Sequence, residues 1–189
     1  MKSIWSHLEG KTHIIWDWNG TILDDVALMV DVISDILDDH GLERIDREKY
    51  VSLFRFPVKE YYKSLGFNFE KESFERLSEK FIAGYREGLI NKTRLHDGMK
   101  EFLGAVNQAN ISQSVLSAAQ QTYLEEQLHH FGVRDYFDHV YGLDDFHASG
   151  KLQRGKELMV AADIPRESAI LIGDTDHDLE VGQALGIEV

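Results

Sequence analysis

The stretch His13-Ile14-Ile15-Trp16-Asp17-Trp18-Asn19-Gly20-Thr21 decides the fold, because an apolar run ends there in a charge and a turn. Its pattern predicts a buried strand over about residues 12–18. In α/β proteins ligands bind at the carboxyl ends of strands, so we expect the Asp17 carboxylate to face a binding crevice. Gly20 lets the chain turn away without a Cβ in the way. An aspartate in this position can serve as nucleophile, as metal ligand or as both.

Three later segments carry polar groups in a similar setting. Residues 111–117 (ISQSVLS) predict a second strand, which ends in the hydroxyl of Ser117. Lys151 opens an amphipathic helix. Residues 169–178 (AILIGDTDHD) predict a third apolar strand, which runs into an acidic cluster. If these strands are neighbours, the acidic cluster lies beside Asp17.

The order of the predicted elements indicates the α/β class. Strands and helices alternate at both ends of the chain, which predicts a Rossmann-like, doubly wound, mostly parallel sheet with helices on both faces. The elements expected after residue 95 are a helix over 98–109, a strand over 111–117, a helix over 121–131, a strand over 138–142, a helix over 151–162, a strand over 169–173, a helix over 177–185 and the start of another strand over 186–189.

Residues 23–94 show helical periodicity and no strand pattern, so they interrupt the alternation. The expected helices run from Val26 to near Gly41, from an N-cap at Asp46 to Leu53, from Pro57 to Gly66, and through a long segment with one apolar face over 74–89. We therefore expect an all-α helical cap over 23–94, inserted into an α/β catalytic core formed by 1–22 and 95–189.

Composition excludes several classes of function. The 189 residues include no cysteine, which excludes disulfides and thiolate metal sites and fits a cytoplasmic protein. The formal charge of −13 argues against nucleic acid or an anionic membrane as partner. No apolar run approaches the ~20 residues of a membrane span. A small phosphorylated substrate would be repelled by this charge unless a cation neutralised the site, so the acidic cluster indicates a metal.

The four segments resemble, in order, the four motifs of the haloacid dehalogenase superfamily of phosphatases. The resemblance covers nearly the whole chain, and the cap inserted after the first motif makes it phosphoglycolate-phosphatase-like. It implies a magnesium-dependent phosphoric monoester hydrolase. The implied substrate is a small phosphorylated metabolite, such as phosphoglycolate or a sugar phosphate, and the implied state is a cytoplasmic monomer or homodimer.

The resemblance also assigns the carboxylates. Asp17 is implied to attack phosphorus, forming an aspartyl-phosphate, and to bind Mg²⁺ together with the backbone carbonyl of Asn19. The family pattern Gly-Asp-x-x-x-Asp implies Asp174 as a direct magnesium ligand and Asp178 as a direct or water-mediated one. Asp176 is the expected bystander, since a carboxylate in the first turn of a helix complements the helix dipole.

The phosphate group is implied to lie among Gly20, Thr21, Ser117, Ala118 and Lys151. A strand-end hydroxyl and the next N–H can hold one phosphoryl oxygen, although a strand-end serine also commonly satisfies a nearby backbone group.

The family's lysine balances charge between nucleophile and phosphoryl group, about two dozen residues before the last acidic motif. Lys151 lies 23 residues before Asp174 and Lys156 only 18, so Lys151 is favoured.

Arg55 is a candidate substrate anchor from the cap. It stands between Phe54 and Phe56, just before Pro57. An exposed surface arginine is the alternative interpretation.

Asn19 departs from the family pattern, because most phosphatases of this superfamily carry a second aspartate there. That aspartate protonates the leaving alcohol and then activates water, whereas a carboxamide neither gives nor takes a proton. Loss of a general acid/base typically costs about 10²–10⁴ in rate. We therefore expect slow or specialised turnover, and a substrate with a good leaving group would need the missing acid least.

Three alternatives stay open. The same aspartate could run another chemistry of the superfamily, such as dehalogenation or phosphonate cleavage. The chain could be a non-catalytic or phosphoacceptor protein, as receiver domains are. It could also be a catalytically dead relative that still binds phosphate or a partner.

Overall fold

The computed structural model describes residues 4–144 and 150–189 and divides the chain into two compact units. The core unit contains Met1–Leu23 and Leu95–Val189, and the cap unit contains Asp24–Arg94. The chain passes between them through two short strands that pair with each other, β2 (Leu23–Asp24) and β3 (Arg94–Leu95). The expectation that residues 23–94 contain no strand is therefore wrong at the two ends of that stretch. Two-residue strands are too short to show alternation in a sequence.

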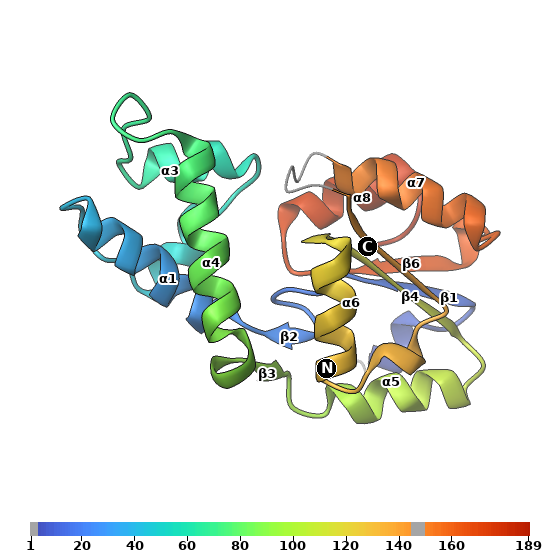
Figure 1. Cartoon of the computed structure of the whole chain (residues 1–189). Coiled ribbons are helices and arrows are strands. Elements are labelled where there is room, and N and C mark those ends of the chain that lie inside the picture. Colours follow the sequence, from blue (N-terminus) through green and yellow to red (C-terminus); the bar gives the residue numbers. More distant parts are fainter. Residues whose placement is uncertain (1–3, 145–149) are drawn as a thin grey trace. The chain divides into compact units, whose positions relative to one another are not determined.

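A four-stranded parallel sheet forms the centre of the core unit (Figure 1). Its strand order is β5-β4-β1-β6. Its strands are β1 (His13–Trp16), β4 (Ser112–Gln120), β5 (His139–Leu143) and β6 (Ala169–Ile172). Trp16 is in register with both Val115 and Ile172, so the residues that follow them emerge at the same edge of the sheet. This confirms the expected α/β class and places the polar strand ends together.

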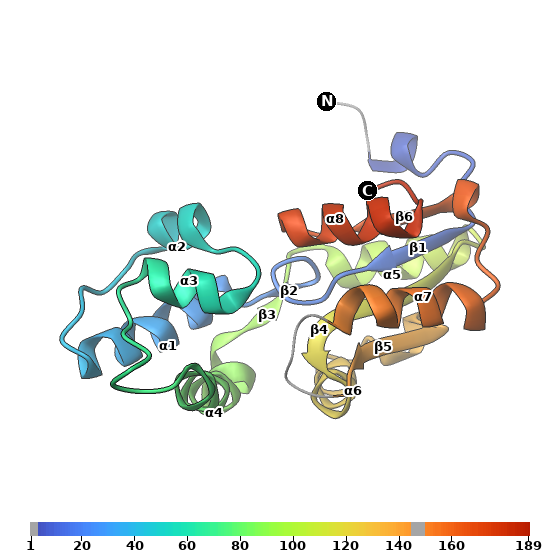
Figure 2. The same cartoon turned by 90° about the horizontal axis from the view of Figure 1, so that it is seen from above.

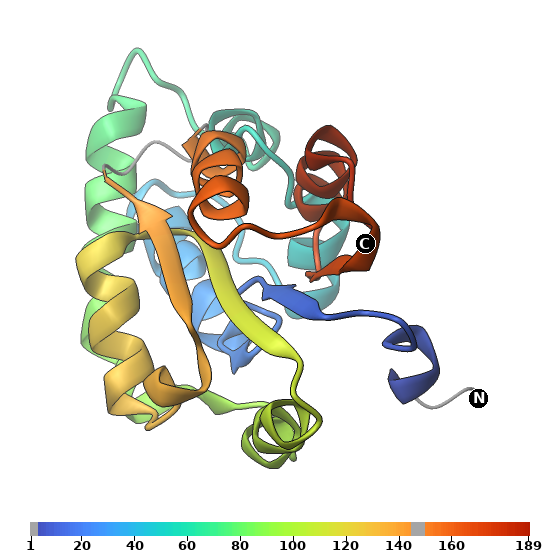
Figure 3. The same cartoon turned by 90° about the vertical axis from the view of Figure 1, so that its right-hand side faces the viewer.

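Helices cover both faces of this sheet (Figure 3). Ile15, Leu116 and Leu171 form one apolar cluster with α7 (Lys151–Ala161) and α8 (Asp176–Leu185). On the opposite face Trp16 contacts Phe102 of α5, with ring centroids 6.0 Å apart. The remaining core elements are α5 (Met99–Gln108), α6 (Gln121–His130) and the short 3-10 helices η1 (Ile4–His7), η2 (Arg134–Tyr136) and η4 (Arg166–Ser168).

Strand β4 runs three residues further than expected, because its register with β5 shifts between Leu116 and Gln120. Beyond this shift the side chain of Gln121 accepts a hydrogen bond from Gly142 N at 2.6 Å and donates one to Val140 O at 3.1 Å. A side-chain amide thus supplies two bonds to the β5 backbone at the irregularity. The end of the chain also adds to the sheet, since Glu188 forms a parallel bridge with Ile170.

The cap unit consists of α1 (Val26–Asp39), α2 (Arg47–Leu53), α3 (Val58–Ser64) and α4 (Phe74–Lys92) (Figure 2). Asp46 caps α2 as expected, accepting from Lys49 N at 2.8 Å. Pro57 precedes α3 as its N-cap and is not its first residue. Helices α1 and α4 pack closely because α4 has a glycine at the contact: a Cβ on Gly88 would lie 2.4 Å from Leu28 Cδ1. None of the described helices is both long and apolar enough to cross a bilayer.

Two tyrosines in the cap unit, the buried Tyr61 and the half-buried Tyr85, predict opposite effects of the same substitution. Tyr61 is 2% exposed, and its hydroxyl has no hydrogen-bond partner among the described residues, whereas Tyr85 OH donates to the fully buried Asp25 at 2.5 Å. We expect Tyr61→Phe to raise the free energy of unfolding by ~1 kcal/mol and Tyr85→Phe to lower it by ~1.5–3 kcal/mol, because only the second removes a bond to a carboxylate. Urea titrations followed by circular dichroism measure both changes, and equal losses would contradict this assignment.

Candidate active site

Strand β1 delivers Asp17 to the carboxyl edge of the sheet between two buried tryptophans. Trp16 and Trp18 are 1% and 0% exposed, and Trp18 Nε1 donates to Gln127 Oε1 at 2.7 Å. The Asp17 backbone N–H donates to Ile172 O at 2.8 Å, which continues the pairing with β6. Apolar anchoring on both sides therefore holds Asp17 at a defined position, 7% exposed.

The turn after Asp17 brings a second carboxylate against the backbone. Gly20 has φ +77°, a left-handed conformation that favours glycine, and a Cβ there would lie 2.2 Å from Asp174 Oδ2. Thr21 Oγ1 donates to Asp174 Oδ1 at 3.3 Å, and a ring nitrogen of His96 bonds Gly20 O at 3.0 Å. Gly20 and Thr21 thus position Asp174 here; their predicted contact with phosphate stays a prediction.

The third carboxylate, Asp178, is held by the start of its own helix. It is 1% exposed, and its Oδ2 accepts from Thr175 N at 3.1 Å and from Thr175 Oγ1 at 2.6 Å. Gly173 leaves room for it, because a Cβ there would lie 2.3 Å from Asp178 Cγ. The sequence interpretation missed Thr175, although Thr-x-x-Asp before a helix is the pattern of a capping box.

Lys151 joins two of these carboxylates. Its side chain is 3% exposed, and its Nζ donates to Asp17 Oδ1 and, at 2.6 Å, to Asp178 Oδ1. Lys156, the alternative in the sequence, is exposed. Of the two lysines, the structure therefore brings Lys151 to the carboxylates.

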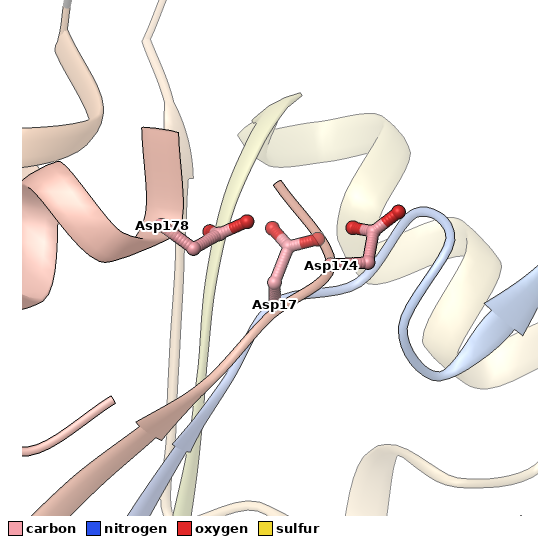
Figure 4. Close-up of side chains that lie close together, drawn as sticks. All are labelled: Asp17, Asp174 and Asp178. Carbon is pink, nitrogen blue, oxygen red and sulfur yellow. The ribbon is translucent and has the colours of Figure 1, made fainter. Parts of the chain in front are cut away.

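Oxygen atoms of Asp17, Asp174 and Asp178 converge within 4.8 Å of one another (Figure 4). Burial raises the pKa of Asp17 to about 7; Asp178 and Asp174 add to the rise and Lys151 opposes it. Burial and then the charge of Asp178 raise the pKa of Asp174. Burial has the same tendency at Asp178, but the Lys151 ammonium outweighs it and lowers the pKa of that carboxyl.

This donor set fits a hard divalent cation. Three carboxylates with oxygens within 4.8 Å of one another repel, and the single charge of Lys151 does not balance three negative charges. In proteins Mg²⁺ favours a site with a few carboxylate ligands and room for water and phosphate. The close approach of Asp174 to Gly20 supports the same conclusion. Any side chain at position 20 would collide with Asp174, so the glycine allows a further carboxylate to lie at an already acidic site.

The other predicted site residues differ in their placement. Ser117 is buried and follows the residues of β4 that pair with β1, but its Oγ accepts from Ala119 N at 3.0 Å, which is the local backbone role. Ala118 beside it is half-buried. Asn19 is half-buried in the turn, where it forms a bridge with Leu23. Contacts of Ser117, Ala118 and Asn19 with phosphate or metal stay predictions.

Two residues lie outside the carboxylate cluster. Asp176 is exposed in the first turn of α8, as expected for a bystander. Arg55 is exposed and belongs to the cap unit, between α2 and α3, so its role as a substrate anchor stays a prediction.

Removing the lysine is expected to destabilise the metal-free core strongly. Lys151→Met leaves Asp17 and Asp178 buried without their cation, and breaking a buried ion pair costs ~3–5 kcal/mol. Lys156→Met, on the exposed side of the same helix, should change the free energy of unfolding by less than ~0.5 kcal/mol. Urea unfolding with EDTA present measures the free energy of unfolding of both variants. Similar losses in the two would show that the buried ion pair does not stabilise the core by this amount.

The sequence matches one family model over most of its length. The model for haloacid dehalogenase-like hydrolases matches residues 14–189. The chain belongs to this family. The match begins inside β1 and includes Asp17, Lys151, Asp174 and Asp178.

Three relatives illustrate the family. The chain is 23% identical to the putative pyrophosphatase PpaX of Caldanaerobacter subterraneus subsp. tengcongensis, covering 93% of this chain and 79% of the relative. It is 24% identical to the phosphoglycolate phosphatase of Photobacterium profundum, covering 93% and 80%. Its identity to the tyrosine-protein kinase PtkA of Mycobacterium tuberculosis is also 24%, over 95% of this chain but only 61% of PtkA. The solved structure of PtkA shares the fold, with a TM-score of 0.80 at 21% identity over 94% of this chain and 81% of that one.

Proposed function

We propose that this chain is a magnesium-dependent phosphatase that hydrolyses a small phosphorylated metabolite through an aspartyl-phosphate on Asp17. The convergence of Asp17, Asp174 and Asp178 at one edge of the sheet, with Lys151 between two of them, is the observation that carries the proposal. The names of two relatives, a pyrophosphatase and a phosphoglycolate phosphatase, support chemistry at a phosphoryl group.

The carboxylates divide into two groups by what already binds them. Asp178 uses one oxygen for Thr175 and the other for Lys151, so water-mediated binding of a metal suits it best. Asp17 binds Lys151 through Oδ1 and Asp174 binds Thr21 through Oδ1, so among the described contacts each has its Oδ2 available, and these two carboxylates would hold Mg²⁺ with the Asn19 carbonyl. Bound Mg²⁺ supplies positive charge that favours ionised Asp17 and draws the phosphate into an acidic site.

The protein's own groups then account for the reaction. A carboxylate oxygen of Asp17 attacks phosphorus as the bond from phosphorus to the leaving oxygen breaks, which gives an aspartyl-phosphate. Lys151, already bound to Asp17, offsets the negative charge that accumulates between nucleophile and phosphoryl group. Water attacks the phosphorus in the second step, releasing phosphate and restoring the Asp17 carboxylate.

We infer that Asn19 slows phosphoryl transfer from substrates with poor leaving groups and slows hydrolysis of the aspartyl-phosphate for every substrate. Its carboxamide cannot protonate a departing alkoxide, and it cannot take a proton from the attacking water. We therefore propose slow turnover, fastest with leaving groups that depart as stable anions. A long-lived aspartyl-phosphate is the second candidate function, because the step that hydrolyses it also lacks a general base.

A direct test measures hydrolysis of aryl, acyl, sugar and pyrophosphate substrates with Mg²⁺ and with EDTA. Borohydride quenching during turnover should reduce the acyl phosphate and convert Asp17 to homoserine, which peptide mass spectrometry locates. Metal-dependent release of phosphate with the label at Asp17 supports the phosphatase. Stoichiometric labelling without turnover would favour the phosphoacceptor, and hydrolysis that persists in EDTA would contradict the proposal.

A further inference from the structure

Asp178 is fixed from one side by a single residue. Thr175 binds Asp178 Oδ2 through both its backbone N–H, at 3.1 Å, and its hydroxyl, at 2.6 Å. A carboxylate can only accept, so the one hydroxyl proton of Thr175 is committed to Asp178. Since Gly173 packs against the same side chain, the carboxylate has little freedom to rotate.

The opposite oxygen of Asp178 faces the lysine. Asp178 Oδ1 accepts from Lys151 Nζ at 2.6 Å, while the same ammonium also donates to Asp17. All three side chains are at least nine-tenths buried, so water cannot replace these bonds cheaply. A continuous chain of hydrogen bonds therefore runs from Thr175 through Asp178 and Lys151 to Asp17.

This chain sets where the ammonium lies. If the Asp178 carboxylate turned, Lys151 would lose the partner that draws it away from Asp17 and would bind the nucleophile alone. A nucleophilic oxygen fully engaged by an ammonium is a poorer nucleophile, and the ammonium would no longer be shared with the incoming phosphoryl group.

We propose that Thr175 is a positioning residue for the reaction, acting through Asp178 to hold Lys151 between Asp178 and Asp17. This inference rests on the proposed phosphatase function. It assigns the Thr175 hydroxyl a role beyond capping α8, and it separates Asp178, which serves the lysine, from Asp174, which Thr21 and Gly20 hold.

The test compares Thr175→Val, which keeps the shape but removes the hydroxyl, with Thr175→Ser, which keeps it. We expect Thr175→Val to lower kcat by about 10–100-fold, as loss of a bond to a charged group would, with KM changed by less than about twofold. Thr175→Ser should restore kcat to within about threefold of the parent. Mn²⁺ binding, measured by calorimetry on the resting protein, should weaken by less than about tenfold in both, because the direct ligands Asp17 and Asp174 are untouched and only the water-mediated contact of Asp178 changes.

A second helix cap provides the control. Ser73 caps α4 in the cap unit, accepting from Arg76 N at 3.3 Å, and Ser73→Ala removes a cap without touching the core. It should lower the melting temperature and leave kcat unchanged below the transition. The Thr175 and Ser73 substitutions are assayed both in the parent protein and in the Asn19→Asp background, where we expect faster turnover.

Three results would overturn the proposal. Thr175→Val with full kcat would show that the hydroxyl only caps the helix. Thr175→Ser as slow as Thr175→Val would show that any change of side-chain shape at this position slows turnover, so that the loss in Thr175→Val does not report the hydroxyl. Absence of metal-dependent turnover in the parent and in Asn19→Asp would instead refute the phosphatase function, and the positioning role with it.

Discussion

Asp17→Asn is expected to reduce metal-dependent phosphate release by at least about 10⁴-fold, the order seen when a catalytic nucleophile is removed. The amide oxygen is a poor nucleophile and cannot form the aspartyl-phosphate. It can still accept a hydrogen bond from Lys151, so the core should remain folded. Phosphate release and borohydride labelling, measured on the same samples, check the result.

The matched control for this variant is Asp176→Asn. It makes the same chemical change two residues from Asp174, but at an exposed carboxylate in the first turn of α8. Its turnover should stay within about threefold of the parent, because a single exposed carboxylate contributes little. Unchanged hydrolysis in Asp17→Asn would show that Asp17 is not the nucleophile.

Asn19→Asp is expected to accelerate hydrolysis of alkyl phosphates by about 10²–10⁴-fold, the usual contribution of a general acid. Alkoxides leave poorly without a proton, whereas nitrophenolates leave as stable anions. The gain with aryl phosphates should therefore be much smaller, and the dependence of rate on leaving-group pKa should flatten. A series of phosphate esters with graded leaving groups measures this slope in both proteins.

Asn91→Asp on α4 serves as the control for added charge, since Asn91 is exposed in the cap unit. It should leave the slope unchanged. An equal gain for alkyl and aryl esters in Asn19→Asp would mean that the substitution acts on a step that the leaving group does not affect, such as binding or the attack of water on the aspartyl-phosphate. No gain at all would mean that another group already supplies the proton.

Much of the core could be predicted because its signals are local. Short strand-like segments rich in apolar residues and bounded by turns identified β1, β4, β5 and β6 to within a few residues, and the interrupting helical periodicity indicated the insertion. The strands β2 and β3 were not predicted, because each has only two residues. The register shift of β4 was not predicted either. It accompanies hydrogen bonds between the Gln121 side chain and the β5 backbone, and no pattern within β4 indicates them.

The sequence by itself determined the order of the polar strand ends, the glycine at position 20 and the asparagine at position 19, all of which are properties of short segments. Only the tertiary structure decided which carboxylate each group serves. Lys151 and Asp17 are separated by 134 residues, and their contact follows from β1 lying between β4 and β6 with α7 packed across that face. Periodicity reports which side of a segment is buried, whereas the partner of a buried charge depends on strand order and on side chains such as Thr175 that orient it.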